Sequence, residues 1–283
     1  MEHLRTKFKG VSERRACRVV GQHRSTNRYV ATPADFETRL VARMVELAEE
    51  NSKWGYRQIH GLLVDEGWPV NNKRIERLWR REGLQLPPHR KKPTGGVDLG
   101  GDEFSIWRLP PRYPNHIWTY DFIQRRTADG RPLRVLNVMD EYTRVGLGGL
   151  CARSIGAREV RRHLTTLFEL HGKPAIIRAD NGREFIANML REWLATEGVR
   201  GVFIAKGKPW QNGYMERFNG TCEREVFRNE LYHSVLEAQV VYDQWLKTYN
   251  TRRRHRGLRG QTPAGYAKMI HDGHNPETDG GGE

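Results

Sequence analysis

The chain has 283 residues, with 48 lysines and arginines against 34 aspartates and glutamates, which gives a formal net charge of +14. This length suits one sizeable domain plus a smaller one, and the charge indicates a polyanionic partner, first of all nucleic acid. No apolar run approaches the roughly 20 residues of a membrane-spanning helix, so we expect a soluble, cytoplasmic chain with no membrane partner. Cys17, Cys151 and Cys222 are odd in number and far apart, which favours reduced thiols over disulfides or a zinc site.

The N-terminal part is predicted to be helical. Residues 1–32 form a polar, basic segment, and Pro33 opens a segment at 33–86. Apolar residues keep a period of about 3.6 over 36–50 and again over 59–66, and Asn71 or Asn72 is a good N-cap for a third helix that runs to Glu82. We therefore expect a small all-α domain over 33–86.

The third predicted helix is basic. Because the major groove admits one helix, three helices with the basic one last favour a helix-turn-helix-like DNA-binding domain. A solvated basic helix in an ordinary bundle is the alternative. The side chains predicted to contact DNA here are Lys73, Arg74, Arg77 and Arg81.

A second, larger domain follows a Pro/Gly-rich linker at 87–112. Alternation over 117–123, a turn pair at Asp129-Gly130 and apolar runs at 133–139 and 145–150 predict three antiparallel strands. The remaining elements are expected to be a helix at 157–170, a strand at 175–179, a helix at 187–197, a strand at 201–205 and a helix from Tyr214.

That order of elements fits the α/β class with a mixed five-strand sheet. We place this core and a C-terminal basic helix region at 113–271. The acidic, Gly-rich tail at 272–283 is expected to be disordered.

Three carboxylates stand out within the core. Asp121 ends an apolar run, Asp180 follows a strand predicted to neighbour that run, and Glu216 comes 35 residues later in the first turn of a helix. Hard Mg²⁺ prefers oxygen ligands, and two such ions can hold the attacking and leaving oxygens of a phosphoryl displacement. The set predicts a metal cage for cutting or joining DNA, although singly Asp180 also suits a turn and Glu216 a helix start.

Further DNA contacts are predicted from the loop at 206–213 and from the C-terminal basic run, which would give affinity without sequence information. Trp210 suits a platform for a DNA base about as well as a core position. The predicted contacts are Lys206, Lys208, Trp210, Asn212, Arg224, Arg252, Arg253 and Arg256.

Three motifs carry a family resemblance: WTYDF at 118–122, ADNGREF at 179–185 and PWQNGYMERFNG at 209–220. They resemble those of bacterial insertion-sequence transposases of the retroviral-integrase (DDE) superfamily, in particular the second-frame protein of two-frame elements. Shorter matches extend over nearly the whole chain, at 11–17, 54–57, 138–144, 249–250 and 262–263. The resemblance implies a ribonuclease-H-like core with Asp121, Asp180 and Glu216 as the acid triad.

The resemblance also implies a reaction and partners. Such an enzyme cuts a phosphodiester at the element's ends, and the released 3′-hydroxyl then attacks target DNA. The expected cofactor is Mg²⁺, with Mn²⁺ as substitute, and two ions are expected. Double-stranded DNA of the ends and of the target would be the substrate of a homo-multimer in the bacterial cytoplasm. An upstream-frame partner fused by frameshifting is also implied, and no heptad repeat appears near the start of this chain.

Two departures from the family pattern concern charge. Glu223 stands where a basic residue is usual. Because it comes seven residues after Glu216, it should lie on the same helix face as Glu216. There it would add negative charge near the DNA phosphate and slow strand joining. Arg254 stands where proline is usual, and we expect no effect on function.

Two other functions remain open on the sequence. A structure-selective nuclease of the same fold would depend on other acids, such as Asp140, Glu141 or Glu184. A non-catalytic repressor of transposition would use residues 33–92 and leave the core silent. The complete triad favours the transposase.

Overall fold

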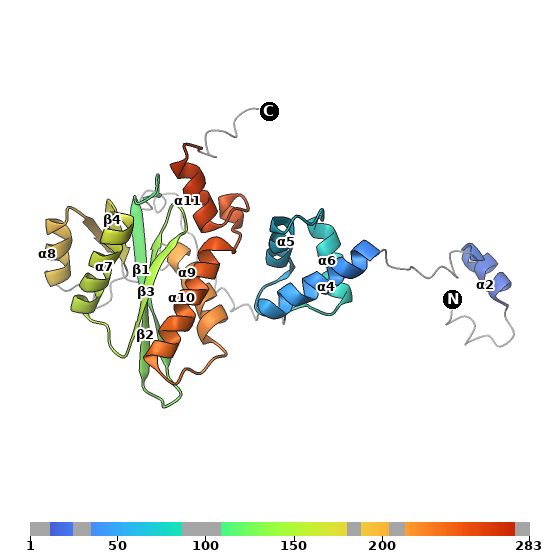
Figure 1. Ribbon diagram of the computed structural model, residues 1–283, viewed down its shortest axis with the longest axis horizontal. Coiled ribbons are helices and arrows are strands. Elements are labelled where there is room, and N and C mark those ends of the chain that lie inside the picture. The colour runs from blue at the N-terminus through green and yellow to red at the C-terminus, as the bar shows by residue number, and fades with distance from the viewer. Residues whose placement is uncertain (1–11, 25–34, 87–108, 180–187, 204–212, 275–283) are drawn as a thin grey trace, which may run out of the picture.

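The structure is a computed structural model that describes residues 12–24, 35–86, 109–179, 188–203 and 213–274 (Figure 1). Most of the predicted linker at 87–112, the loop at 206–212 and the tail from 275 therefore lie outside the described residues. No helix in the described part is long and apolar enough to cross a bilayer. All three cysteines are free and buried, as expected.

A short helix that the sequence analysis did not predict lies in the basic N-terminal segment. Helix α2 (Glu13–Val20) begins at Ser12, whose hydroxyl accepts a hydrogen bond from the backbone of Arg15, and ends at Gly21 in the left-handed region, with φ of 68°. A serine N-cap and a glycine C-cap are ordinary helix boundaries. The sequence analysis missed these two helix boundaries because the segment is polar and basic.

The helical domain consists of α4 (Asp35–Glu50), α5 (Tyr56–Asp65) and α6 (Asn72–Arg81). As predicted, the Asn71 side chain caps α6, accepting from the backbone of Arg74 at 2.8 Å. The apolar residues of the three helical periods meet in one core, in which the following side chains are fully buried: Leu40, Met44, Ile59, Leu63, Ile75 and Leu78. The three predicted helices are confirmed.

The larger domain is built on a mixed sheet of five strands in the order β3-β2-β1-β4-β5. The strands are β1 (Ile117–Arg126), β2 (Pro132–Asp140), β3 (Gly146–Ala152), β4 (Ile176–Ala179) and β5 (Arg200–Phe203). The first three pair antiparallel, whereas β4 and β5 run parallel to β1. The predicted α/β class and mixed five-strand sheet are confirmed.

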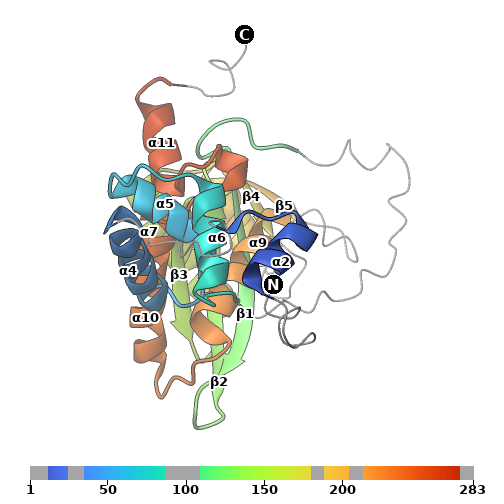
Figure 2. The ribbon, with the colours of Figure 1, turned by 90° about the vertical axis from the view of Figure 1, so that its right-hand side faces the viewer.

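Helices cover both faces of this sheet (Figures 1 and 2). One face packs on α7 (Ala157–His171) and α8 (Asn188–Thr196). The other packs on α9 (Gly213–Cys222), which continues as a π-helical turn η3 (Glu223–Phe227), and on α10 (Val235–Thr251). The 3₁₀ turn η4 (Arg256–Leu258) and α11 (Pro263–His271) follow.

Glycines in β3 let the helices approach the sheet closely. A Cβ at Gly149 would collide with the ring of Tyr242 on α10, and one at Gly148 would lie 2.8 Å from Leu167 on α7. Both faces of this edge strand therefore need small residues, which explains the GLGG sequence of β3.

Candidate active site and DNA-contacting surfaces

Asp121 lies at the middle of the central strand β1, half-buried and opposite Asn137 of β2. Asn219 of α9 donates from Nδ2 to Asp121 Oδ2 at 3.0 Å, and its Oδ1 accepts from Asn137 Nδ2 at 2.7 Å. The amide of Asn219 thus connects two strands to α9 and fixes the orientation of the Asp121 carboxylate. Sequence analysis did not single out Asn219, although it lies three residues after Glu216.

Glu216 lies in the first turn of α9, with an exposed side chain. Residues three apart share a helix face, so Glu216 is on the face from which Asn219 reaches Asp121. Partial burial raises the pKa of the Glu216 carboxyl above its usual value. The side chain of Asn219 therefore connects β1, which carries Asp121, to α9, which carries Glu216.

Asp180 itself lies outside the described residues, but its strand is placed. Ala179, the last residue of β4, pairs in parallel with Tyr120, which directly precedes Asp121. The predicted neighbourhood of the two strands is confirmed. Other predicted site residues also lie outside the described residues: Glu184, Lys206, Lys208, Trp210 and Asn212.

The donor set suits a hard cation, because Asp121 and Glu216 offer carboxylate oxygens. Among the described residues alone, no three acidic, histidine or cysteine side chains gather as a metal site. A complete set would require Asp180 from the segment that follows β4.

The competing acids Asp140 and Glu141 have structural partners. Asp140 accepts from the backbone of Asn115 at 3.1 Å and of Tyr142 at 2.9 Å, and from the Thr143 hydroxyl at 3.0 Å, while burial raises its pKa. Glu141 is fully buried and takes Arg178 Nη1 on both oxygens, at 2.8 and 2.9 Å. These carboxylates tie the end of β2 to Arg178 of β4, which lies on the other side of β1, and to residues just before β1 and just after β2, which leaves them unsuited to hold a catalytic ion.

Glu223 is paired with Arg125, four residues beyond Asp121 on the same face of β1. A cation from the strand therefore offsets the negative charge that was expected beside the phosphate, and the slowing of strand joining stays a prediction. Sequence spacing along one helix could not reveal a partner on β1.

The basic residues of α6 gather around one acid. Arg74, Arg77 and Arg81 approach the carboxylate of Glu37 on α4 at 3.2, 3.7 and 2.7 Å. These bonds, above all that from Arg81, lower the pKa of Glu37. A hollow of about 410 Å³ at the start of α6 is lined by Asn71, Lys73, Arg74 and Arg77. Glu37 thus orders three arginines, of which Arg81 also pairs with Glu82 at 2.8 Å, and a positive excess remains.

The C-terminal basic run is divided between two environments. Arg252 and Arg256 are exposed. Arg253 donates to Glu225 at 2.5 Å and lies 5.8 Å from the ring centre of Trp54 in the helical domain, and Arg224, half-buried, lies 3.7 Å from Glu225. The run therefore contributes both to the surface and to the contact between the two domains.

Comparison with known families matches three regions. Residues 35–92 match the HTH-like domain, and residues 111–209 and 197–263 match two integrase core domain families. These ranges contain α4 to α6 and the five-strand sheet with α9 and α10 respectively.

Comparison with individual proteins agrees. The chain is 35% identical to an uncharacterized 31.7 kDa protein of insertion element IS407 from Burkholderia multivorans, over 94% of each chain. It is 25% identical to the transposase of insertion sequence element IS904 from Lactococcus lactis, over 78% of this chain and 89% of that protein. A chain of the simian T-cell lymphotropic virus intasome in complex with PP2A regulatory subunit B56 gamma aligns at a TM-score of 0.50, with 15% identity over 83% of this chain and 76% of that one, and shares the fold.

Proposed function

Because the chain belongs to the bacterial insertion-element transposases of the integrase (DDE) superfamily, we propose that it cuts the ends of its own element and joins them to target DNA. The reaction is a phosphodiester hydrolysis followed by a transesterification, with no covalent protein intermediate. The observation that carries the proposal is the link from Asp121 through Asn219 to the helix of Glu216, beside the strand that leads to Asp180.

The carboxylates of Asp121, Asp180 and Glu216 would hold the divalent ions. Bound there, Mg²⁺ or Mn²⁺ supplies charge for the transferring phosphate and lowers the pKa of the attacking water. Asn219 keeps the Asp121 oxygens oriented, and the rigid sheet under them reduces the reorganisation needed when DNA arrives.

DNA is held, on this proposal, by the arginines that Glu37 arranges on α6 and by the exposed Arg252 and Arg256. The fused upstream-frame partner and assembly into a multimer on DNA belong to the same proposal, since joining two ends requires both ends in one complex. Phosphate contacts fix the register of the duplex, whereas base contacts supply sequence preference.

A supercoiled plasmid that carries the two flanking ends of the element tests this function. We expect nicks confined to the element's ends, each with a free 3′-hydroxyl, and joined products, all dependent on Mg²⁺ or Mn²⁺ and abolished by chelator. Nicks scattered over branched or bent sites would favour the nuclease. Tight binding of the ends without cleavage, also when the upstream partner is fused, would favour the repressor.

A further inference from the structure

The outward side of α9 carries a strip without side chains. Glu216 and Arg217 are exposed on this helix, whereas its buried residues pack toward the sheet and α10. At about 3.6 residues per turn, Gly213 and Gly220 lie between Glu216 and Arg217 on the helix surface. A bare strip therefore separates the proposed metal ligand from an arginine.

Gly220 has no structural reason among the described residues. Glycine inside a helix is less favourable than alanine, because it loses more conformational freedom on folding. The φ of Gly220 lies outside the left-handed region, so an alanine would fit the backbone. A Cβ there would meet no atom of the described residues within 4 Å, apart from its chain neighbours and the backbone of the helix. The glycine therefore leaves space for a molecule outside the fold to approach α9 closely.

Positive charge lies on the Arg217 side of this strip. Arg217 comes three residues after Tyr214, so the two residues share a helix face. The Arg144 guanidinium, from the turn between β2 and β3, lies 3.3 Å from the ring centre of Tyr214, and its Nη1 donates to the carbonyl of Glu141. Arg217 has no ion pair with an acid in the described part of the chain.

The charges of these arginines converge on one histidine. His255 is half-buried, and its pKa is lowered to about 4, chiefly by desolvation and then by the charges of Arg253, Arg144 and Arg217. Of the three, Arg253 is paired with Glu225 at 2.5 Å. Arg144 and Arg217 therefore supply the positive charge that is open to an anion beside α9.

Arg144 has a backbone conformation that glycine adopts without strain. Its φ is 62°, and its backbone N–H donates to the carbonyl of Asp140 at 2.9 Å in the turn that follows β2. Because a side chain costs free energy in this left-handed region, an arginine at such a position indicates a use of its guanidinium. Asp140 is close enough to act on Arg144, but its oxygens accept hydrogen bonds from other donors. Even with Asp140 counted against Arg144 and Arg217, an excess of about one positive charge remains.

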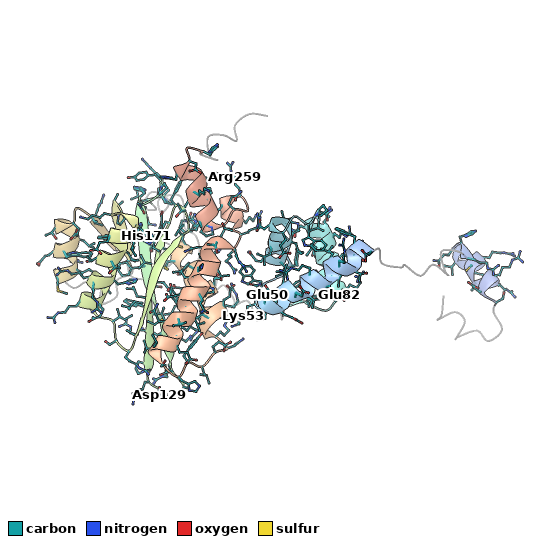
Figure 3. All side chains as sticks on the ribbon, in the orientation of Figure 1. Glu50, Lys53, Glu82, Asp129, His171 and Arg259 are labelled. Carbon is teal, nitrogen blue, oxygen red and sulfur yellow. The ribbon has the colours of Figure 1, made fainter. Side chains whose placement is uncertain are left out.

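The strip lies on the side of the core that meets the helical domain. Helix α9 continues into η3, where the carbonyl of Glu225 accepts from Nζ of Lys53, labelled in Figure 3, at 3.0 Å. Asn219 reaches Asp121 from the same helix. DNA held by the helical domain can therefore reach Glu216 without crossing to the opposite face of the sheet.

The width of the strip suits neighbouring phosphates of one strand. On a helix about 11 Å across, two positions about 100° apart place the ends of their side chains about 8 Å apart. A DNA strand carries one phosphate per about 3.4 Å of helix axis, so this distance corresponds to about two nucleotides. Resting on the proposed function, we propose that the DNA strand under attack crosses α9 over Gly220, and that Arg217 and Arg144 bind its phosphate about two nucleotides from the attacked one.

Neutral phosphates test the contact directly. A duplex that carries one end of the element receives a single methylphosphonate at each position within about five nucleotides of the cut. Binding is measured by fluorescence anisotropy without divalent metal. Wild-type binding should weaken about threefold to tenfold at one or two of these positions. Arg217→Ala and Arg144→Gly should bind the unmodified duplex more weakly and lose no further affinity at the same positions, because the partner of the phosphate is already absent.

A larger side chain on the strip tests the path of the strand. Gly220→Leu should lower binding of the same duplex, and cleavage and joining with it, by about tenfold. Its unfolding midpoint should not fall, because leucine is a better helix former than glycine. Ala195→Leu adds bulk at an exposed position of α8 on the other face of the sheet, and Arg162→Ala on α7 matches the charge lost in Arg217→Ala. Both control variants should bind and cut like wild type.

Three results contradict the proposal. If Arg217→Ala is as sensitive as wild type at every methylphosphonate position, Arg217 binds no phosphate of this strand. If Gly220→Leu binds and cuts like wild type, the strand does not cross the strip. If Arg144→Gly folds and keeps the sensitivity of wild type, Arg144 has no part in the contact. The exposed Arg217 carries the test if Arg144→Gly unfolds.

Failure of the strip and failure of the proposed function give different results. A wild-type protein that shows the predicted methylphosphonate pattern but cuts no ends would contradict the proposed function and leave the strip as a DNA site. A wild-type protein that cuts the ends without sensitivity to any methylphosphonate would contradict the strip alone. Absence of any binding to the duplex would contradict both.

Discussion

Asn219 shows how one uncharged residue can orient a carboxylate that is proposed to be catalytic. It donates to Asp121 and accepts from the fully buried Asn137, so both ends of its amide are used. Breaking such a buried arrangement leaves a polar group without a partner, at a cost of about 1 to 3 kcal/mol. The orientation of Asp121 therefore depends on the packing of α9 against the sheet.

We predict that Glu223 stabilises the fold through its ion pair with Arg125. The family-like change Glu223→Lys would place two cations face to face, so we expect the free energy of unfolding to fall by about 1 kcal/mol. This value is modest because both side chains are about one-third exposed. The swapped pair Arg125→Glu/Glu223→Lys should regain most of that loss. Denaturant unfolding of wild type, Glu223→Lys, Arg125→Glu and the swapped pair gives the coupling free energy, and zero coupling would show that the pair contributes nothing.

At the residue scale, the three acids could be proposed as one set because their motifs have distinctive neighbours in sequence. The side chains that the acids contact could not be predicted in this way. Asn137 is 82 residues from Asn219, and Arg125 is paired with an acid on a different element. Such contacts depend on which face of α9 meets β1, and periodicity alone does not determine that choice.

At the element scale, the packing of α7 on the glycine-rich strand β3 half-buries a histidine. His163 lies over Gly148, 3.5 Å from the position of a Cβ there, and its Nε2 has no hydrogen-bond partner among the described residues. Burial lowers the pKa of His163 to about 4. His255, between α10 and η4, is also half-buried, and desolvation is the main cause that lowers its pKa to about 4.

These histidines predict a loss of stability in acid. In the unfolded chain their pKa is near 6.5, so the unfolded state binds protons first as the pH falls from about 6.5 to 4. Stability is then complete above pH 6.5 and is lost toward pH 4, by at most about 3 kcal/mol for each histidine. The free energy of unfolding of the His163→Leu variant should depend less steeply on pH, with about half of the contribution of the two histidines lost. Denaturant unfolding at several pH values measures this slope. An unchanged slope would mean that His163 has the same pKa in the folded and the unfolded protein.

The sequence predicted most elements, since their apolar periods and caps are local. It did not predict the π-helical turn at Glu223–Phe227, into which α9 runs directly. This turn places Glu225 under Trp245 and Arg253, with hydrogen bonds of 3.0 and 2.5 Å. The irregularity depends on tertiary packing, which explains why local sequence does not reveal it.

At the scale of the whole molecule, the helical domain is docked on the core through the C-terminal basic run. The Gln58 amide donates to the carbonyl of Arg254 at 2.9 Å and accepts from its backbone N–H at 3.0 Å, and the Arg254 guanidinium is paired with Asp65. Gly61 leaves the room that the Arg254 side chain occupies. Arg254 thus has a structural role that the sequence, which only showed an absent proline, could not reveal.

Loosening this contact should expose the basic run. Because Gln58→Ala removes two reciprocal hydrogen bonds worth about 1 kcal/mol each, the undocked population should rise roughly fivefold to thirtyfold. Amide hydrogen exchange of residues 252–256 should accelerate accordingly, whereas Arg39→Ala, an exposed change on α4, should leave it unchanged. Equal exchange in Gln58→Ala and wild type would mean that the two domains are held together by other contacts.

The central claim is that Asp121, Asp180 and Glu216 act together on DNA, and the most direct test compares carboxylate substitutions in one assay. Cleavage of plasmid-borne element ends is measured with Mg²⁺ and Mn²⁺ for wild type, Glu216→Gln, Glu184→Gln and Glu192→Gln, the last an exposed glutamate of α8 as control. The account predicts loss of at least a hundredfold in Glu216→Gln alone, with folding retained. Loss in Glu184→Gln together with an active Glu216→Gln would contradict it and identify a different set of catalytic acids.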